Sequence, residues 1–353
     1  MKLNYKYSSV LKSYIIGWFV ASIIWLLVSN TNKGKITFIE TTYANELIIF
    51  VVTWLLQAFV YGFLQVLINK FVKNRVPFFK LQIYSLLLQL ITAIFIVISV
   101  FVIFKSANIL EEGTDILTFL NDLDGLWVVF LFALIVNFTI NTVDYIDLVL
   151  GKGNLLKMIK GTFYAPREDE KIFMFLDLRS STTYAEKLGH VLYSKLIQDC
   201  FDDLAVVNEY EAEIYQYVGD ESVLTWSPKD GLKNNNCIRA FFAFKDGIHK
   251  RASYYMNTYG VLPEFKAGLN TGVVMVAEVG KLKREIAYHG DTINTAARLE
   301  GECNRLKAEM VISEHLKNAL TLDSDFSAQF EDEIILKGKN VALKVYSVER
   351  INL

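Results

Sequence analysis

The sequence contains few prolines, cysteines and histidines, with four, three and four of these residues in a chain of 353. An odd number of cysteines without metal-ligand spacing indicates free thiols in a reducing compartment rather than a disulfide framework or a zinc site. An excess of charge of one sign is also missing. The formal net charge of −2 leaves no electrostatic footprint for nucleic acid, so we predict no nucleic-acid partner.

Hydrophobic residues, in contrast, make up 53% of the chain and concentrate in its first 145 residues. Four long runs lie there, each close to the roughly 20 residues that cross the hydrocarbon core of a bilayer. A helical bundle of a soluble protein is the alternative, but water gives no reason for such long runs without charge. We therefore predict a four-helix transmembrane domain over residues 1–145. Its spans are Tyr14–Ser29, Leu47–Ile68, Leu81–Phe104 and Leu126–Val143.

The loops between these runs differ in charge. Basic residues precede the first run and separate the second from the third, whereas acidic residues fill the loop before the fourth. Because basic loops stay inside, we predict a multi-pass protein of the plasma membrane with both termini and the C-terminal domain in the cytoplasm. The basic residues are Lys2, Lys6, Lys12, Lys70, Lys73, Arg75 and Lys80, and the acidic ones are Glu111, Glu112, Asp115, Asp122 and Asp124.

Amide side chains lie within the apolar runs. They can hydrogen-bond between helices or line a ligand site, and we favour helix packing. As a hypothesis, the spans sense a stimulus and bias the geometry of a dimer, the alternative being a plain anchor. The amides are Gln57, Gln65, Gln89, Asn137 and Asn141.

The pattern changes after the fourth run. Residues 146–168 carry two neighbouring glycines, a proline and a charged end, which predicts a linker. Residues 169–353 then read as a mixed domain: a buried strand over Lys171–Leu178, a helix from about Ser181, a hairpin over Glu213–Trp226 and further elements, with separate strands expected over 265–272 and 273–280. The order β-α-β-β-α-β with additions predicts an α+β fold of the ferredoxin-like palm type.

Two acids mark the chemistry of this domain. Asp177 ends the first buried strand and Asp220 lies at the tip of the hairpin, positions that a palm brings together. Facing carboxylates repel unless a cation lies between them, and a hard divalent ion with oxygen ligands is the usual solution. Glu221 is expected to point away, because adjacent strand residues alternate in direction. Turns favour aspartate anyway, but an acid that closes an apolar strand needs a reason.

Further polar residues fit a nucleotide. Ser180, Ser181 and Thr182 follow Asp177 at a helix start, where backbone N–H groups can hold a polyphosphate, although serines there are usually caps. The later helix carries an amide and a guanidinium on one face, which can position a ribose and neutralise charge on an α-phosphate. These are Asn294 and Arg298, while Lys337 could meet the outer phosphates or simply be a surface lysine.

Four motifs together resemble the class III nucleotidyl cyclases, which make cyclic AMP or cyclic GMP. They are "FLDL", "VGDE", "GDTINTAARLE" and "LKGKNVALKVYSV", in the family's order over about Lys171–Val348. The resemblance implies that Asp177, Asp220 and the Leu178 carbonyl bind two Mg²⁺ ions, with Mn²⁺ as the other candidate. It also implies a homodimer with shared active sites, because Asn294 and Arg298 would come from the second subunit. Attack of the ribose 3′-hydroxyl on its own α-phosphorus would release pyrophosphate.

The positions that read the base depart from the family. Adenylyl members typically have Lys and Asp where this chain has Gln216 and Ala287, and guanylyl members have Glu and a small polar residue. An amide can donate or accept, and alanine can do neither. We favour ATP over GTP, because adenylyl activity is commoner in membrane cyclases of this kind. We predict a membrane-bound adenylate cyclase for intracellular signalling; the alternatives are a guanylate cyclase and a catalytically inactive relative that only binds nucleotide.

Overall fold

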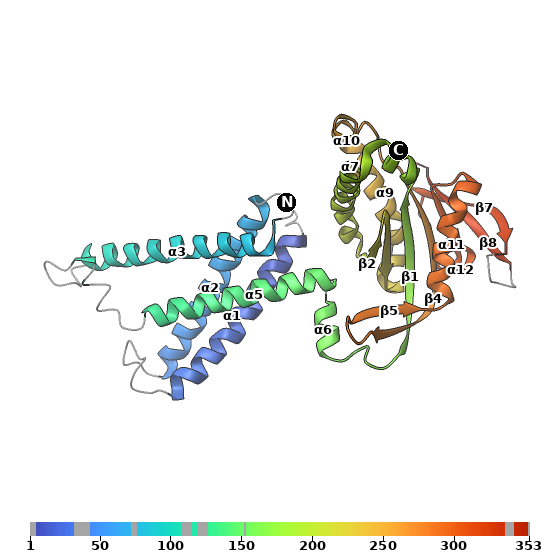
Figure 1. Cartoon of the computed structure of the whole chain (residues 1–353). Helices are drawn as coiled ribbons and strands as arrows, with labels where there is room; N and C mark the ends of the chain where they lie inside the picture. The colour runs from blue at the N-terminus through green and yellow to red at the C-terminus, as the bar shows by residue number, and fades with distance from the viewer. Residues whose placement is uncertain are drawn as a thin grey trace. The chain divides into compact units, whose positions relative to one another are not determined.

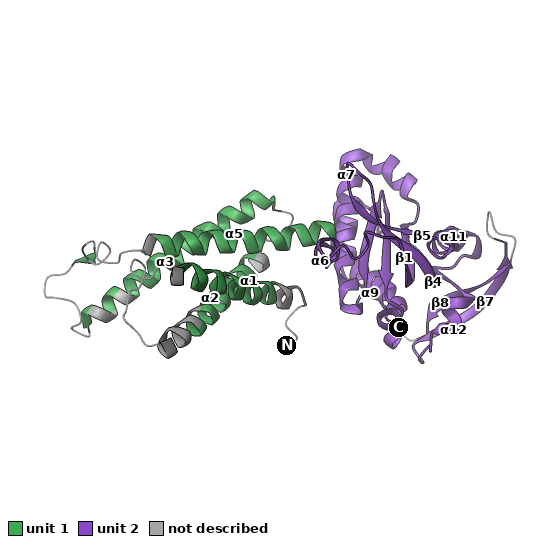
Figure 2. Ribbon diagram, turned by 90° about the horizontal axis from the view of Figure 1, so that it is seen from below, with its two compact units in different colours: residues 1–150 green, residues 151–353 purple. Residues whose placement is uncertain are grey.

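The computed structural model of the chain describes residues 5–31, 43–71, 76–106, 115–116, 118, 126–151, 153–335 and 342–351. Its contacts divide the chain into two compact units, Met1–Leu150 and Gly151–Leu353. The first unit is helical and the second combines helices with a large sheet (Figure 1). Figure 2 gives the two units separate colours.

The four predicted apolar runs lie on four helices of the first unit. Three of these helices contain stretches long and apolar enough to cross a membrane, at Val10–Val28, Phe78–Ser99 and Val128–Leu150. In the remaining helix, which spans Tyr43–Phe71, the apolar part within the described residues is the shorter Trp54–Ile68. These helices indicate that the unit associates with a membrane. The helices are α1 (Tyr5–Thr31), α2 (Tyr43–Phe71), α3 (Phe78–Ser106) and α5 (Leu126–Leu150).

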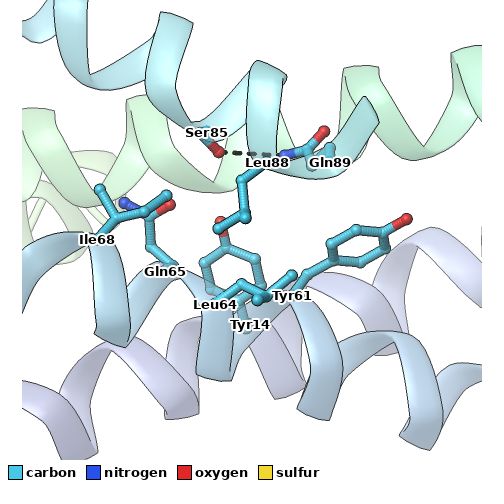
Figure 3. A pocket seen from close by; sticks show the side chains of 8 residues that line it. All are labelled: Tyr14, Tyr61, Leu64, Gln65, Ile68, Ser85, Leu88 and Gln89. Atoms are coloured by element: carbon cyan, nitrogen blue, oxygen red, sulfur yellow. Dashed lines mark hydrogen bonds between the residues drawn. The ribbon is translucent and has the colours of Figure 1, made fainter. Parts of the chain in front are cut away.

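Polar side chains connect these helices inside the first unit. Asn137 and Asn141 on α5 accept hydrogen bonds from Trp18 Nε1 at 3.0 Å and from the Tyr14 hydroxyl at 2.9 Å, both on α1. Asn141 also donates to the Ser85 hydroxyl of α3 at 3.3 Å. Because apolar chains gain little by leaving lipid for one another, such bonds between helices set their pairing. A small adjoining pocket (Figure 3) is lined by Tyr14, Tyr61, Leu64, Gln65, Ile68, Ser85, Leu88 and Gln89.

The second unit is built on one mixed sheet with the strand order β2-β3-β1-β4-β6-β8-β7, with β5 paired to β4. Strand β1 lies between β3 and β4, antiparallel to both. The two strands expected over 265–272 and 273–280 are one continuous strand, β4, which pairs with β1 along its whole length up to Val276. The strands are β1 (Arg167–Leu178), β2 (Glu213–Val218), β3 (Glu221–Trp226), β4 (Phe265–Val279), β5 (Glu285–His289), β6 (Met310–Ser313), β7 (Phe326–Ile334) and β8 (Leu343–Arg350).

Helices cover both faces of this sheet. Helices α7 and α9 lie on one face of the sheet and α11 lies on the other (Figure 1). Ile172, Met174, Leu176 and Leu178 of β1 belong to the main core with residues of α7 and α9, whereas Phe173 packs with Ala296 of α11. The helices and 3₁₀ segments of this unit are α6 (Asn154–Ile159), α7 (Ser181–Asp203), η1 (Leu204–Tyr210), α8 (Pro228–Leu232), η2 (Lys233–Asn235), α9 (Asn236–Lys250), α10 (Ala252–Tyr259), α11 (Asp291–Leu306) and α12 (Glu314–Ala319).

Helix α11 packs directly on the backbone of β4. A Cβ atom added at Gly268 would lie 2.0 Å from the Glu300 nitrogen and 2.5 Å from the Ala296 carbonyl oxygen, so only glycine permits this approach. Ala296 and Leu299 are buried on the side of α11 that faces the sheet. The close contact fixes which face of α11 points away from β4.

Candidate active site

The tip of the β2–β3 hairpin lies beside the end of β1. Val218 pairs with Glu221, which leaves Gly219 and Asp220 as a two-residue turn, and Gly219 has a φ of 65° that favours glycine. Asp177 lies directly opposite Glu221 in the β1–β3 register. The predicted proximity of the hairpin tip to Asp177 is therefore present in the fold.

The expectation that Glu221 points away is wrong. Residues directly opposite each other in an antiparallel pair project on the same face of the sheet, so Glu221 shares the face of Asp177. The alternation rule does not relate Glu221 to Asp220, because Asp220 belongs to the turn and not to a strand. This face carries one more acid than sequence reasoning placed there.

A buried lysine lies on the other flank of Asp177. Lys266 of β4 is opposite Asp177 in register, and its Nζ lies 3.3 Å from Asp177 Oδ2 and 2.5 Å from Glu300 Oε1 of α11. The side chains of Lys266 and Glu300 are only 9% and 11% exposed, against 23% for Asp177. Sequence reasoning missed this pair, whose two members are far apart in the chain.

The pKa values of two acids at this site, Asp177 and Glu221, are raised. Burial raises the pKa of Asp177, and the charge of Asp220 raises it further, while Lys266 acts in the opposite direction. Burial also raises the pKa of Glu221 to about 7, with further increases from the charges of Glu300, Asp177 and Asp220. Four carboxyl groups thus influence one another around a single lysine, an arrangement that favours the arrival of further positive charge.

The segment after β1 turns sharply into α7. Ser180 has a φ of 57°, in the left-handed region, and among the described residues its side chain makes no cap to the helix that begins at Ser181. Positive φ is costly for serine, which is consistent with a local functional constraint on this turn. Tyr193 of α7 was not anticipated: burial raises its pKa, and the charge of Asp220 and a hydrogen bond to Asp220 raise it further.

Asn294 and Arg298 lie on the opposite side of α11 from the sheet. Asn294 is exposed and Arg298 partly buried, whereas Ala296, Leu299 and Glu300 are buried between the helix and the sheet. The two predicted residues share one face, because four residues complete about one helical turn. Within one chain that face is turned away from the sheet that carries Asp177.

The base-reading positions lie on two different strands. Gln216 is exposed on β2, next to an irregularity in the β2–β3 pairing, and Ala287 is buried on β5 opposite Ala277. Their neighbours meet, since the Tyr288 N–H donates to the Tyr215 hydroxyl at 3.4 Å. The predicted phosphate ligand Lys337 lies outside the described residues.

Comparison with known proteins identifies relatives of the second unit. Residues 163–350 match the family described as Adenylate and Guanylate cyclase catalytic domain. The chain is 34% identical over 201 residues to adenylate cyclase 2 of Rhizobium meliloti (strain 1021), covering 57% of this chain and 55% of that protein. It is 25% identical over 191 residues to the receptor-type guanylate cyclase gcy-4 of Caenorhabditis briggsae, covering 51% and 16%.

A bacterial light-regulated adenylyl cyclase has a similar solved structure, with a TM-score of 0.54, 21% identity, and coverage of 65% of this chain and 67% of that chain. This likeness concerns the fold and confirms the predicted α+β palm. The chain spans about half the length of the Rhizobium relative, so the match concerns the catalytic region. Because the family match covers more than half of the chain, the resemblance predicted from the four motifs is confirmed: this chain belongs to the adenylate and guanylate cyclase catalytic domain family.

Proposed function

We propose that this chain is a membrane-bound adenylate cyclase that converts ATP to 3′,5′-cyclic AMP and pyrophosphate for intracellular signalling. The observation that carries the proposal is the placement of Asp177 opposite the hairpin tip that holds Asp220, beside the turn at Ser180. The similarity to an adenylate cyclase of Rhizobium meliloti favours ATP as the substrate. Guanylate cyclases also occur among the relatives, so GTP is the alternative.

The carboxyl groups at this site fit a hard divalent cation. Cyclases of this family generally use divalent metal ions. The acids around Asp177 outnumber the neighbouring lysine, and carboxylate oxygens are the ligands that Mg²⁺ prefers. Within the described residues, no three acidic, histidine or cysteine side chains form a complete metal site. Asp177 and Asp220 would therefore share two Mg²⁺ ions with the Leu178 carbonyl and the phosphates. Bound there, Mg²⁺ would acidify the attacking hydroxyl and neutralise the phosphates.

The remaining predicted residues would bind the nucleotide. Ser180, Ser181 and Thr182 would meet the phosphates at the start of α7, where backbone N–H groups and the helix dipole favour anions. Lys337 would act on the outer phosphates as a point charge.

Asn294 and Arg298 require a second copy of the chain. Their face of α11 points away from the sheet that carries Asp177, so one chain does not assemble both halves of a site. In a twofold dimer, α11 of one copy would present Asn294 to the ribose and Arg298 to the α-phosphate bound by the other copy. The homodimer with shared active sites thus agrees with the observed geometry.

The adenine would be read by few polar groups. Gln216 is exposed and can donate or accept, whereas Ala287 offers only an apolar contact. We infer that Gln216 sets the ATP preference alone at this pair of positions, and that discrimination against GTP is modest.

The membrane unit would hold the catalytic unit at the cytoplasmic face of the plasma membrane. The basic loops predict this orientation, and ATP and GTP are cytoplasmic substrates. We propose functional boundaries of 1–145 for the transmembrane domain, 146–168 for the linker and 169–353 for the catalytic domain. The division of the chain into two compact units after Leu150 falls within the proposed linker, and β1 begins at Arg167, near the end of that linker.

The test uses the full chain in lipid nanodiscs with ATP or GTP and Mg²⁺ or Mn²⁺. We expect cyclic AMP, and a loss of at least about 100-fold in turnover for Asp177→Asn, because removing one charge at the reacting phosphates has an effect of this order. Mixing Asp177→Ala with Arg298→Ala chains should restore activity, since the heterodimer contains one intact site. Nucleotide binding without turnover would instead identify an inactive relative, and failure of the mixture would refute the shared site.

A further inference from the structure

The ion pair between Lys266 and Glu300 lies between two parts of the catalytic machinery. Lys266 contacts the Asp177 carboxylate at 3.3 Å on one side and Glu300 at 2.5 Å on the other. Asp177 ends β1, whereas Glu300 belongs to α11, the helix that carries Asn294 and Arg298. One lysine thus connects the metal-binding edge of the sheet to the helix of the opposite half-site.

Burial gives this contact consequences that a surface pair would not have. The Lys266 and Glu300 side chains are about nine-tenths buried, and an exposed ion pair would contribute little. Removal of Lys266 leaves the Glu300 charge inside the protein without its counter-ion, and removal of Glu300 leaves Lys266 paired with Asp177 alone, so neighbouring groups must move. The neighbours that can respond are the Asp177 carboxylate and helix α11.

The position of α11 is sensitive to this contact. Glu300 follows Arg298 by two residues and lies on the buried side of the helix. The helix backbone rests directly on Gly268 of β4, and the Glu300 nitrogen is part of this contact. The Glu300 carboxylate therefore adds a polar contact to the apolar packing of Ala296 and Leu299, and these contacts together set the direction of the helix face that carries Asn294 and Arg298.

We propose that the Lys266–Glu300 pair links the two active sites of the dimer, because within one chain it positions Asp177 for one site and the Asn294–Arg298 face for the other. This inference rests on the proposed function and its shared sites. Lys266 and Glu300 act here as positioning residues. A change in the occupancy of one site would move Asp177, then Lys266 and Glu300, and so alter the helix that serves the second site.

The test uses heterodimers with one intact site. One full-length chain carries Arg298→Ala and supplies the working metal residues, and its partner carries Asp177→Ala and supplies the working α11. Glu300→Gln is then placed in either chain. In the metal-supplying chain we expect the Mg²⁺ concentration for half-maximal rate to rise about fivefold, and in the helix-supplying chain we expect kcat to fall about tenfold with an unchanged Mg²⁺ requirement.

A matched control is Glu302→Gln, the same change on the same helix. Glu302 pairs with Arg305 at 2.5 Å in a more exposed setting, so neither placement should alter either parameter. An effect of Glu300→Gln in only one placement, or in neither, would overturn the link. If Glu300→Gln unfolds the unit, as labelling of the buried Cys303 would reveal, Lys266→Arg keeps the cation and is placed in the same way.

A second readout needs no turnover. Mn²⁺ binding to full-length Glu300→Gln in the presence of a non-cyclisable ATP analogue, followed by electron paramagnetic resonance, should weaken about fivefold relative to Glu302→Gln. If the wild-type chain makes no cyclic nucleotide, the proposed function fails on the turnover assay, while this titration still decides whether Glu300 positions Asp177. Equal Mn²⁺ affinity in the two variants would refute that role.

Discussion

Replacing Glu221 with glutamine should stabilise the metal-free catalytic unit at neutral pH. Glu221 lies opposite Asp177, and burial together with the charges of Glu300, Asp177 and Asp220 raises its pKa from 4.5 to about 7. A raised pKa means that the folded state disfavours the ionised carboxylate. Glutamine has nearly the same shape and carries no charge, so the variant avoids this repulsion.

The sign and size of the effect follow from linkage. Below the unfolded pKa of 4.5, Glu221 is protonated in both states and contributes nothing; as the pH rises towards 7, the unfolded state ionises first and the folded wild type loses stability. At about 1.36 kcal/mol per pKa unit, the full shift sets an upper bound of about 3 kcal/mol. Because Glu221 is only partly buried and solvent screens its charge, we expect about 1–2 kcal/mol at pH values above about 7.5.

The three cysteines provide an assay specific for the catalytic unit. Cys200, Cys237 and Cys303 are all buried in that unit, and the sequence has no other cysteine, so a brief thiol-labelling pulse in a urea series reports its unfolding within the full chain. In EDTA, the stability difference between Glu221→Gln and wild type should grow from about pH 5 to pH 8. Glu349→Gln, at an exposed glutamate of β8, should show no such trend.

A difference that stays flat or falls with rising pH would refute the electrostatic account of this site. Saturating Mg²⁺ and a non-cyclisable nucleotide should shrink the difference, because bound cations offset the repulsion among the carboxylates. Persistence of the full difference under those conditions would place the ions away from Glu221.

Three further predictions concern other parts of the chain. Gln216→Lys should raise the ratio of ATP to GTP turnover, and Gln216→Glu should lower it, each by about tenfold, because lysine can only donate a hydrogen bond to the base and glutamate can only accept one. Initial-rate assays with both nucleotides check this. Gly268→Ala should destabilise the catalytic unit by at least about 2 kcal/mol in the thiol-labelling assay, since the new Cβ would lie 2.0 Å from the Glu300 nitrogen. Trp18→Phe should cost the membrane unit about 0.6–1 kcal/mol in detergent unfolding through loss of the bond to Asn137, whereas a value near zero would exclude this bond from helix packing.

The parts of the site that were predictable are those with a local signal. The apolar run that ends in Asp177 identifies a buried strand and its end, and the Gly-Asp turn between two alternating segments identifies the hairpin tip. Strand pairing then brings the two acids together, because a palm places β1 beside the hairpin. The helical spacing of Asn294 and Arg298 likewise depends only on the geometry of one helix.

The unpredicted residues depend on register between distant segments. Glu221 faces Asp177 only because of the alignment of β1 with β3, and a shift of one residue would turn it to the other face. Lys266 follows Phe265 at the start of β4, where a lysine ordinarily marks an exposed strand end, yet α11 covers it. The division of 265–280 into two strands failed for a related reason, since Gly272 looked like a turn signal but is paired with Lys171 in mid-strand.

The direction of the α11 face connects the fold to the need for a partner. The buried residues of α11 are fixed by contact with β4, and this contact leaves Asn294 facing away from the sheet. No rotation of the helix within one chain can bring Asn294 to Asp177 without removing Ala296 and Leu299 from the core, at a cost comparable to the stability of a small domain. A second chain meets the requirement with both cores intact. In the proposed dimer, enzymatic activity should therefore depend on the concentration of the dimer and on the arrangement of the two chains, because each site would be divided between them.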